Sequence, residues 1–352
     1  MGKLEMITLS DTGAKVSYIV AVYNVGEYIE RCASSLFEQT LGDLEIVFVN
    51  DASTDNSEAI IRKSLEDYPQ RKGQMKILTH KTNMGLVETR KDGFYTATGE
   101  FVIFIDGDDY VEPQMAELMY AKATETGADL VVCDYLFQEV AEEIVISQVP
   151  NGVIGDGENV RDDIINRRVT GNIWCKMIRR SLFLENDIVW PANVSHEDMV
   201  MSDMAAYYAR QFAHVPIPLY HYVYRSNSVS NIVDPEFVVW KMELYKDNIR
   251  VIKEFFEREG VSEKYAEGLL TEKVLARNLI LPYTNKLRYR RIWLRTYPEV
   301  NRILLFGNKE YRSTYREKIW MMAIWLGLYP RMKRRLLSKR FKPDRIWSLM
   351  TK

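Results

Sequence analysis

The sequence predicts an α/β fold in which a mostly parallel sheet is flanked by helices and followed by a helical region. The strongest indication is Phe101–Tyr110, FVIFIDGDDY, where five apolar residues run directly into carboxylates. Such a run is typical of a strand buried on both faces, as in a parallel sheet. A strand–loop–helix unit also repeats from Val16 onward, which indicates a sheet covered by helices. After Pro235, apolar residues recur three and four apart, as in helices.

The first half of the chain is expected to alternate strands and helices. Mostly apolar runs indicate the strands, whereas apolar side chains at helical spacing indicate the helices. Asp55 or Ser53 is suited to cap one helix, and Gly99 to follow the end of another. We expect strands at Val16–Val22, Glu45–Val49, Met75–Thr79 and Phe101–Ile105, and helices at Glu27–Phe37, from about Asp55 to Tyr68 and from Gly85 to about Ala97.

The second half is less regular. Pro113 suits the first turn of a helix, residues 138–160 are expected to hold a hairpin, and Asn172–Phe183 is partly apolar with a basic face. The other expected elements are helix Pro113–Thr126, strand Asp129–Tyr135, a turn at Asn193–Asp198, helix Met199–Ala209, strand Val215–Tyr224, and helices Phe237–Glu259 and Glu263–Leu281.

Charge is divided unevenly along the 352 residues. From Lys286 onward there are 19 Lys and Arg against 4 Asp and Glu, although the whole chain has a net charge of -2. This division predicts an anionic partner at one end. The acidic remainder would repel nucleic acid, so no nucleic-acid partner is expected. The three cysteines form no C-x-x-C pair, which argues against a disulfide framework or zinc site and fits a reducing compartment.

Three expected strands end in polar residues at the same edge of the sheet, at Tyr23, Asp51 and Asp106. Ligands of such sheets bind beyond the carboxyl ends of the strands, so this edge predicts a nucleotide site. The adjacent carboxylates Asp106, Asp108 and Asp109 repel one another, and Mg²⁺ or Mn²⁺ would balance them. The alternative is an acidic turn that only ends a strand.

Four motifs resemble those of the family 2 glycosyltransferases: VAVYN at 20–24, NDASTD at 50–55, NMG at 83–85 and DGDD at 106–109. These are inverting enzymes of the GT-A fold that use nucleotide-activated sugars. The resemblance covers residues 16–230. It implies a catalytic domain at 1–234, with a nucleotide-sugar half at about 16–135 and an acceptor half at about 136–234, followed by the helical, basic region 235–352.

The resemblance also implies roles for individual residues. Tyr23 would stack on the base, Asp51 would accept its hydrogen bond, and Arg90 would lie near the nucleotide. Asp106 and Asp108 would bind the metal. The full set of expected nucleotide-binding residues is Ala21, Tyr23, Asn24, Asp51, Asn83, Gly85, Arg90, Asp106 and Gly107. Four positions differ from many relatives, which have proline at Ala21, aspartate at Asn50, glycine at Ala52 and serine at Gly107.

Later motifs imply the catalytic and acceptor residues. In Ser195-His196-Glu197-Asp198, Asp198 resembles the general base, and Glu197 is its neighbour; alternatively both only favour the first turn of a helix. Donor or acceptor contacts are expected from Asp109, Trp174, Lys176, Tyr224, Arg225 and Ser228. The alternative for the W-x-K element is a buried Trp with a snorkelling Lys. His80 and His214 are interpreted as structural residues.

Taken together, we expect a cytoplasmic, metal-dependent, inverting hexosyltransferase. Its donor would be a UDP-sugar, because Asp51 suits a uracil N–H, and its acceptor a lipid-linked glycan in surface-polysaccharide synthesis. Two alternatives stay open: a sugar-nucleotide nucleotidyltransferase, and a non-catalytic module that binds nucleotide sugars or membranes. The glycine-rich loop typical of the former does not follow the first strand.

The carboxyl-terminal region is predicted to lie peripherally on the cytoplasmic face of the membrane. Ile319–Tyr329 is an apolar run of 11 residues, too short to span a bilayer, and includes Trp320 and Trp325. Basic residues from Arg331 onward would bind an anionic leaflet. The alternative is a core helix with solvated charges after it.

Overall fold

The computed structural model describes residues 13–139, 142–147, 157–192, 196–225, 232–307 and 315–326. The chain divides into two compact units. The first unit comprises Met1–Ile165 and Val169–Ser226, and the second comprises Asn166–Arg168 and Asn227–Lys352. The expected boundary at residue 234 stays a prediction.

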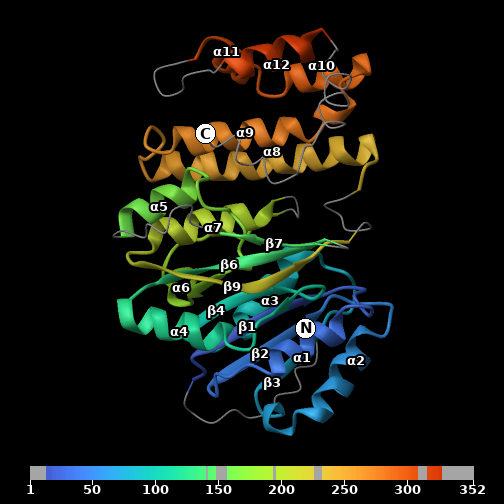
Figure 1. Ribbon diagram of the computed structural model, residues 1–352, viewed down its shortest axis with the longest axis vertical. Helices are drawn as coiled ribbons and strands as arrows, with labels where there is room; N and C mark the ends of the chain where they lie inside the picture. The colour runs from blue at the N-terminus through green and yellow to red at the C-terminus, as the bar shows by residue number, and fades with distance from the viewer. Residues whose placement is uncertain are drawn as a thin grey trace. The chain divides into compact units, whose positions relative to one another are not determined.

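The first unit is built on one mixed sheet of nine strands, with order β3-β2-β1-β4-β8-β6-β9-β5 and with β7 paired to β6. Figure 1 shows these strands in the blue to yellow-green part of the chain, with helices beside them. The strands are β1 Val16–Val22, β2 Leu44–Asn50, β3 Met75–Thr79, β4 Phe101–Asp106, β5 Tyr110–Val111, β6 Leu130–Glu139, β7 Glu142–Ile146, β8 Lys176–Arg179 and β9 Phe212–Val223.

The first four of these strands are parallel. The apolar side chains of β1, β2 and β4 are buried on both faces, whereas those of β3 are only partly buried. On one face, Tyr18 and Val20 of β1 belong to a core with residues of α1 (Ile29–Phe37) and α4 (Met115–Thr126). On the other face, α3 (Leu86–Thr96) packs on β1 and β2. This two-sided burial explains the continuous apolar run that predicted the central strand.

Beyond β4 the sheet becomes mixed. β8 pairs antiparallel with both β4 and β6, whereas β6 and β9 are parallel and shift register between Cys133 and Tyr135. The two-residue strand β5, which the sequence did not indicate, pairs antiparallel with β9. The remaining helices of this unit are α2 Ser57–Ser64, α5 Gly157–Ile165, α6 Ser181–Glu185 and α7 Glu197–Tyr208.

The region 138–160 is partly as expected. Strands β6 and β7 form an antiparallel hairpin, with Gln138 opposite Glu143. The same region also contains the start of α5, which the sequence analysis did not predict. Glycine at its first position and a short apolar pattern hid this helix, because both are weak helix signals.

The second unit is helical in its described part. Its helices are α8 Pro235–Arg258, α9 Ala266–Asn278, α10 Leu287–Arg295, α11 Pro298–Phe306 and α12 Tyr315–Trp325. Trp293, Met242 and Ile280 lie in its core. Arg277 is fully buried there, with its guanidinium 3.5 Å from the centre of the Trp293 ring. Among the described helices, none is both long and apolar enough to cross a bilayer.

Within the apolar run Ile319–Tyr329, the side chains described at 321–326 are divided between core and surface. Met321, Ala323 and Ile324 are buried, and Met321 and Ile324 join the core of the second unit, as in the core-helix alternative. Trp325 and Leu326 are exposed at the end of α12. The basic stretch from Arg331 onward lies outside the described residues.

Candidate functional site

Hydrogen bonds join the loop after β1 to the loop after β2. Asn24, in the left-handed region with φ 51°, accepts a hydrogen bond from the Thr54 N–H at 2.8 Å through Oδ1. Its own N–H donates to Ser53 Oγ at 3.1 Å. Tyr23, immediately before, is 48% exposed, so its ring is free to take a planar ligand. The expected nucleotide residues Tyr23 and Asn24 therefore lie at one edge, with Asn24 shaping the backbone.

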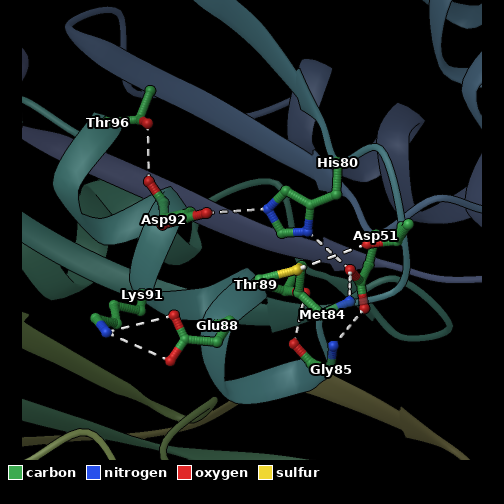
Figure 2. A network of polar contacts seen from close by, with 10 residues as sticks. Asp51, His80, Met84, Gly85, Glu88, Thr89, Lys91, Asp92 and Thr96 are labelled. Carbon is green, nitrogen blue, oxygen red and sulfur yellow. Dashed lines mark hydrogen bonds and ion pairs between the residues drawn. The ribbon is translucent and has the colours of Figure 1, made fainter. Parts of the chain in front are cut away.

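Asp51 lies where β2 ends, with its carboxylate turned to the next loop (Figure 2). Oδ1 accepts the Met84 N–H at 2.7 Å, and Oδ2 accepts the Gly85 N–H at 2.8 Å. His80 Nδ1 lies 2.7 Å from Oδ1. This carboxylate, 4% exposed, thus holds the turn that begins α3. Asn83 in the same turn is exposed.

The acidic turn follows β4 closely because it carries glycine. A Cβ on Gly107 would lie 2.8 Å from the Ala21 carbonyl oxygen, and the Gly107 N–H donates to that oxygen at 3.1 Å. A serine here would clash unless the backbone moved. Ala21 and Gly107 therefore act through their backbones, which set the position of Asp106 and Asp108.

The three carboxylates of this turn have separate partners. Asp108 forms an ion pair with Arg225, whose guanidinium also lies 5.1 Å from the Tyr28 ring centre. Burial raises the pKa of Asp108, repulsion from Asp106 adds to this, and Arg225 opposes it. Asp109 is buried and accepts hydrogen bonds from two residues of β9, Tyr220 and Val223.

Arg90 joins the acidic turn to the second carboxylate motif. Its Nη2 donates to Asp106 Oδ1 at 2.7 Å, and its Nη1 donates to Glu197 Oε1 at 2.6 Å. Burial would lower the pKa of Arg90, but the nearby carboxylates outweigh it and raise this pKa above its ordinary value. One buried cation on α3 therefore fixes carboxylates from two other parts of the chain.

Glu197 and Asp198 occupy the first turn of α7, behind His196 in the left-handed region with φ 60°. Burial raises the pKa of Glu197 to about 8, against the pull of Arg90. Burial also raises the pKa of Asp198, although Arg90 and Lys176 act against it. A carboxyl pair with raised pKa values, one member buried and the other partly exposed, is typical of general bases, because their proton affinity suits neutral pH.

The remaining expected residues have more varied positions. Trp174 is buried and stacks on Tyr220 at 4.4 Å between ring centroids. Lys176 is fully buried, with Nζ donating to the Thr170 carbonyl at 2.8 Å. The W-x-K pair thus packs in the interior. Tyr224 donates its N–H to the Gln138 carbonyl at 3.0 Å; Ser228 lies outside the described residues.

A cavity of about 330 Å³ opens beside the acidic turn. Carboxylate, guanidinium and aromatic groups line it, a combination that suits a polar ligand. Arg31 lies over the Tyr110 ring at 3.4 Å. The lining residues are Glu27, Tyr28, Arg31, Asp108, Asp109, Tyr110, Gln138, Val223 and Tyr224.

Comparison with known proteins identifies the family. The model of glycosyl transferase family 2 matches residues 17–193. The putative glycosyltransferase EpsH of Bacillus subtilis is 32% identical over 265 residues, which cover 74% of each chain. The chain belongs to glycosyl transferase family 2. The expected family is therefore confirmed.

Solved structures show the fold of this glycosyltransferase. S. aureus TarS 1-349, in complex with UDP-GlcNAc, is similar with a TM-score of 0.67 at 22% identity, covering 93% of this chain and 94% of that one. The mannosyltransferase PcManGT from Pyrobaculum calidifontis, in complex with GDP-Man and Mn²⁺, has a TM-score of 0.51 at 15% identity, covering 93% and 90%. These similarities confirm the GT-A-like α/β fold.

Two side chains that orient site residues of this glycosyltransferase were not indicated as site residues by the sequence. His80, expected to be structural, contacts Asp51 and follows β3 just as Asp51 follows β2. That position at a fourth strand end was the available signal. Tyr220 donates its hydroxyl to Asp109 at 2.5 Å, and nothing in the local sequence indicated this pairing.

Proposed function

We propose that this glycosyltransferase moves a sugar from a UDP-sugar to a glycan hydroxyl, with inversion at the anomeric carbon. The observation that carries the proposal is the bridge made by Arg90. It ties Asp106, at the edge of the donor site, to Glu197, beside the base candidate Asp198. Arg90, a single buried cation, thereby holds the residues proposed for the donor site next to those proposed for the acceptor step.

The donor half of the proposal rests on the first three strand ends. Tyr23 offers an exposed ring on which a base can stack. Asp51 offers a fixed carboxylate that can accept an N–H from the base. The UDP-GlcNAc bound by TarS, a protein of similar fold, supports a uridine donor.

The transfer step is assigned to Asp198. Its carboxylate takes the proton of the acceptor hydroxyl as that oxygen attacks the anomeric carbon opposite the departing diphosphate. One direct displacement inverts the configuration, so a single base suffices. Glu197 is held by Arg90 and serves to position the pair.

A divalent cation, Mn²⁺ or Mg²⁺, fits Asp106 and Asp108 as a two-carboxylate site. The described residues contain no group of three or more His, Cys, Asp or Glu suited to a metal, so the donor diphosphate would supply further oxygens. A cation held by both carboxylates would relieve the repulsion by which Asp106 raises the pKa of Asp108. When bound, the ion neutralises charge on the leaving diphosphate. Mn²⁺ bound to PcManGT supports this assignment.

The acceptor is proposed to be a lipid-linked glycan of surface-polysaccharide synthesis, reached from the cytoplasmic face of the membrane. The basic stretch after Arg331 supports a membrane location, since it is net positive and follows an apolar helix end. The cavity beside Asp108 supports a polar, hydroxyl-rich substrate.

A panel of nucleotide sugars with Mn²⁺ or Mg²⁺ tests the proposal. We expect release of UDP and transfer to a hydroxyl acceptor, with loss of both in excess chelator. The product bond, read by NMR, should have the anomeric configuration opposite to that of the donor. A retained configuration, or full transfer in excess chelator, would refute the mechanism.

A further inference from the structure

We propose that His80 determines which base the donor site accepts, because it leaves Asp51 with one acceptor position for a uracil-type N–H. This inference rests on the proposed function, in which Asp51 meets the base of a nucleotide donor. It adds a specificity-determining residue that lies behind the carboxylate and does not touch the ligand.

The contacts of the Asp51 carboxylate are unequal at its two oxygens. Oδ1 accepts the Met84 N–H at 2.7 Å. His80 Nδ1, also at 2.7 Å, fills the second acceptor position of Oδ1 as a donor, because a ring nitrogen without a proton would be repelled by a carboxylate oxygen this close. Oδ2 accepts the Gly85 N–H at 2.8 Å, its one hydrogen bond among the described residues. A carboxylate has about four acceptor positions. One position is therefore left, on Oδ2.

His80 is held so that its ring keeps this arrangement. Its backbone N–H donates to the Asn50 carbonyl at 2.9 Å, and the ring is only 8% exposed. Asp92 Oδ2, on α3, lies 3.1 Å from the opposite ring nitrogen, Nε2. Figure 2 shows the imidazole between the two carboxylates. The ring thus cannot turn away from Asp51 without losing both contacts.

Bases differ in how many donors they present to a carboxylate. Uracil and thymine present a single imide N–H between two carbonyl groups. Guanine presents an N–H and an amino group side by side, which together require both carboxylate oxygens. With Oδ1 filled, the second guanine donor would be buried without a partner, and such a loss is strongly selective. The geometry therefore favours uridine or thymidine diphosphates over guanosine diphosphate.

Two variants at His80 separate this role from a general structural one. In His80→Asn the amide nitrogen takes the place of Nδ1 and can still fill Oδ1. In His80→Gln the same amide lies one methylene farther out, where it replaces Nε2 and contacts Asp92 instead. The two side chains are otherwise alike in chemistry, so each serves as the control for the other.

The experiment is calorimetric titration of UDP, dTDP and GDP into the full chain with Mg²⁺. The readout is the affinity for each nucleotide, and no transfer activity is needed. We expect the wild-type protein and His80→Asn to bind UDP about 100-fold more tightly than GDP, on the scale of a site built for one donor pattern. His80→Gln should lower that ratio about tenfold because GDP binds more tightly, as expected for one added hydrogen bond to a charged group. A loss of folding would weaken both ligands and leave the ratio unchanged.

Three results overturn the inference in distinguishable ways. An equal UDP/GDP ratio in His80→Gln and wild type would show that His80 has no part in selection, with the proposed function intact. Wild-type binding of GDP as tight as that of UDP would refute the single-acceptor argument. If the wild-type chain binds no nucleoside diphosphate, the proposed function falls as well.

Discussion

Arg90 is buried with its two terminal nitrogens on different carboxylates, so its loss would leave both of them uncompensated. We expect Arg90→Gln to lower the free energy of unfolding by about 3–5 kcal/mol, the range for breaking a buried ion pair. Arg90→Lys keeps the charge but not the fork that spans Asp106 and Glu197. The free energy of unfolding of Arg90→Lys should lie between those of the wild type and Arg90→Gln. Urea unfolding of the three proteins checks this order, and wild-type stability in Arg90→Gln would contradict it.

The raised pKa values at the start of α7 predict an unusual pH profile. A base must be deprotonated, so kcat/KM should rise with pH as the Glu197–Asp198 pair loses its proton. Burial raises the pKa of both groups, that of Glu197 to about 8. The rise in kcat/KM should therefore occur at a higher pH than that at which ordinary carboxyl groups titrate. Asp198→Asn should lose on the order of 10²–10⁴-fold in turnover while UDP-sugar affinity stays near wild type.

The matched variant for this test is Glu197→Gln, which removes the positioning carboxylate and leaves Asp198 in place. It should retain part of the turnover and still show a rising pH limb. A profile that is flat from pH 5 to pH 9 in the wild type would remove the pair from the catalytic step.

Ala52 is strained by its backbone, and the strain can be measured. It has φ 57° in the loop after Asp51, in the left-handed region that disfavours residues with a Cβ. Ala52→Gly should raise the free energy of unfolding by about 1 kcal/mol. Gly127 is the control, since it has φ 68° and no atom within 4 Å of an added Cβ. Gly127→Ala should lower stability by a similar amount in urea unfolding, and no change in either variant would contradict this reading.

At the scale of elements, Asp109 couples the acidic turn to β9. Oδ2 accepts the Tyr220 hydroxyl at 2.5 Å and Oδ1 accepts the Val223 N–H at 2.8 Å. Asp109→Ala would bury both donors without partners and should cost about 1–3 kcal/mol for each lost acceptor. Asp109→Asn can still accept from Val223 and donate to the Tyr220 oxygen, so it should cost much less.

Thermal unfolding and Mg²⁺-dependent UDP binding of these two Asp109 variants are the measurements. If the residue positions β9, stability falls in Asp109→Ala and the remaining folded protein still binds UDP. Wild-type stability combined with lost UDP binding would instead give Asp109 the direct donor role expected from the sequence.

Elements were predictable where local sequence decides them. Met75–Thr79 matches β3 at both ends, because an apolar run there is bounded by polar residues. The strands β5 and β8 are short, and their pairing partners are distant in sequence, so no local pattern could reveal them. The conformations of the loops were harder to predict than the strands for the same reason, because contacts across the sheet determine the shape of each loop.

The candidate site followed the same division. Asp51 and Asp106 could be predicted because strand ends in a parallel sheet share one edge, whereas Arg90, on α3, was predicted only from the family resemblance. Two partners could not be predicted, since His80 meets Asp51, and Tyr220 meets Asp109, only after folding. Sequence alone identifies the groups that face a ligand more readily than the groups that orient them.

At the scale of the whole molecule, the carboxyl-terminal stretch gives a prediction about location. Residues 327–352 carry nine basic side chains against one acidic one. The full chain should therefore bind vesicles that contain anionic lipid, with roughly 1 kcal/mol from each basic side chain near the leaflet. Added salt should weaken this binding, because it screens the charges.

The core of the second unit determines where the chain should be shortened for this test. Ending it after Lys318 would remove Met321 and Ile324, which lie in the core of the second unit, and would confuse lost binding with lost folding. Ending it after Leu326 keeps that core and removes the basic stretch. We expect the shortened chain to stay in the supernatant when anionic vesicles are sedimented, while the full chain pellets with them. A full-length control that combines Arg331→Gln, Lys333→Gln, Arg334→Gln and Arg335→Gln should bind anionic vesicles less than wild type and fold normally. Equal sedimentation of all three forms, or binding to neutral vesicles alone, would show that the basic stretch does not bring this glycosyltransferase to a membrane.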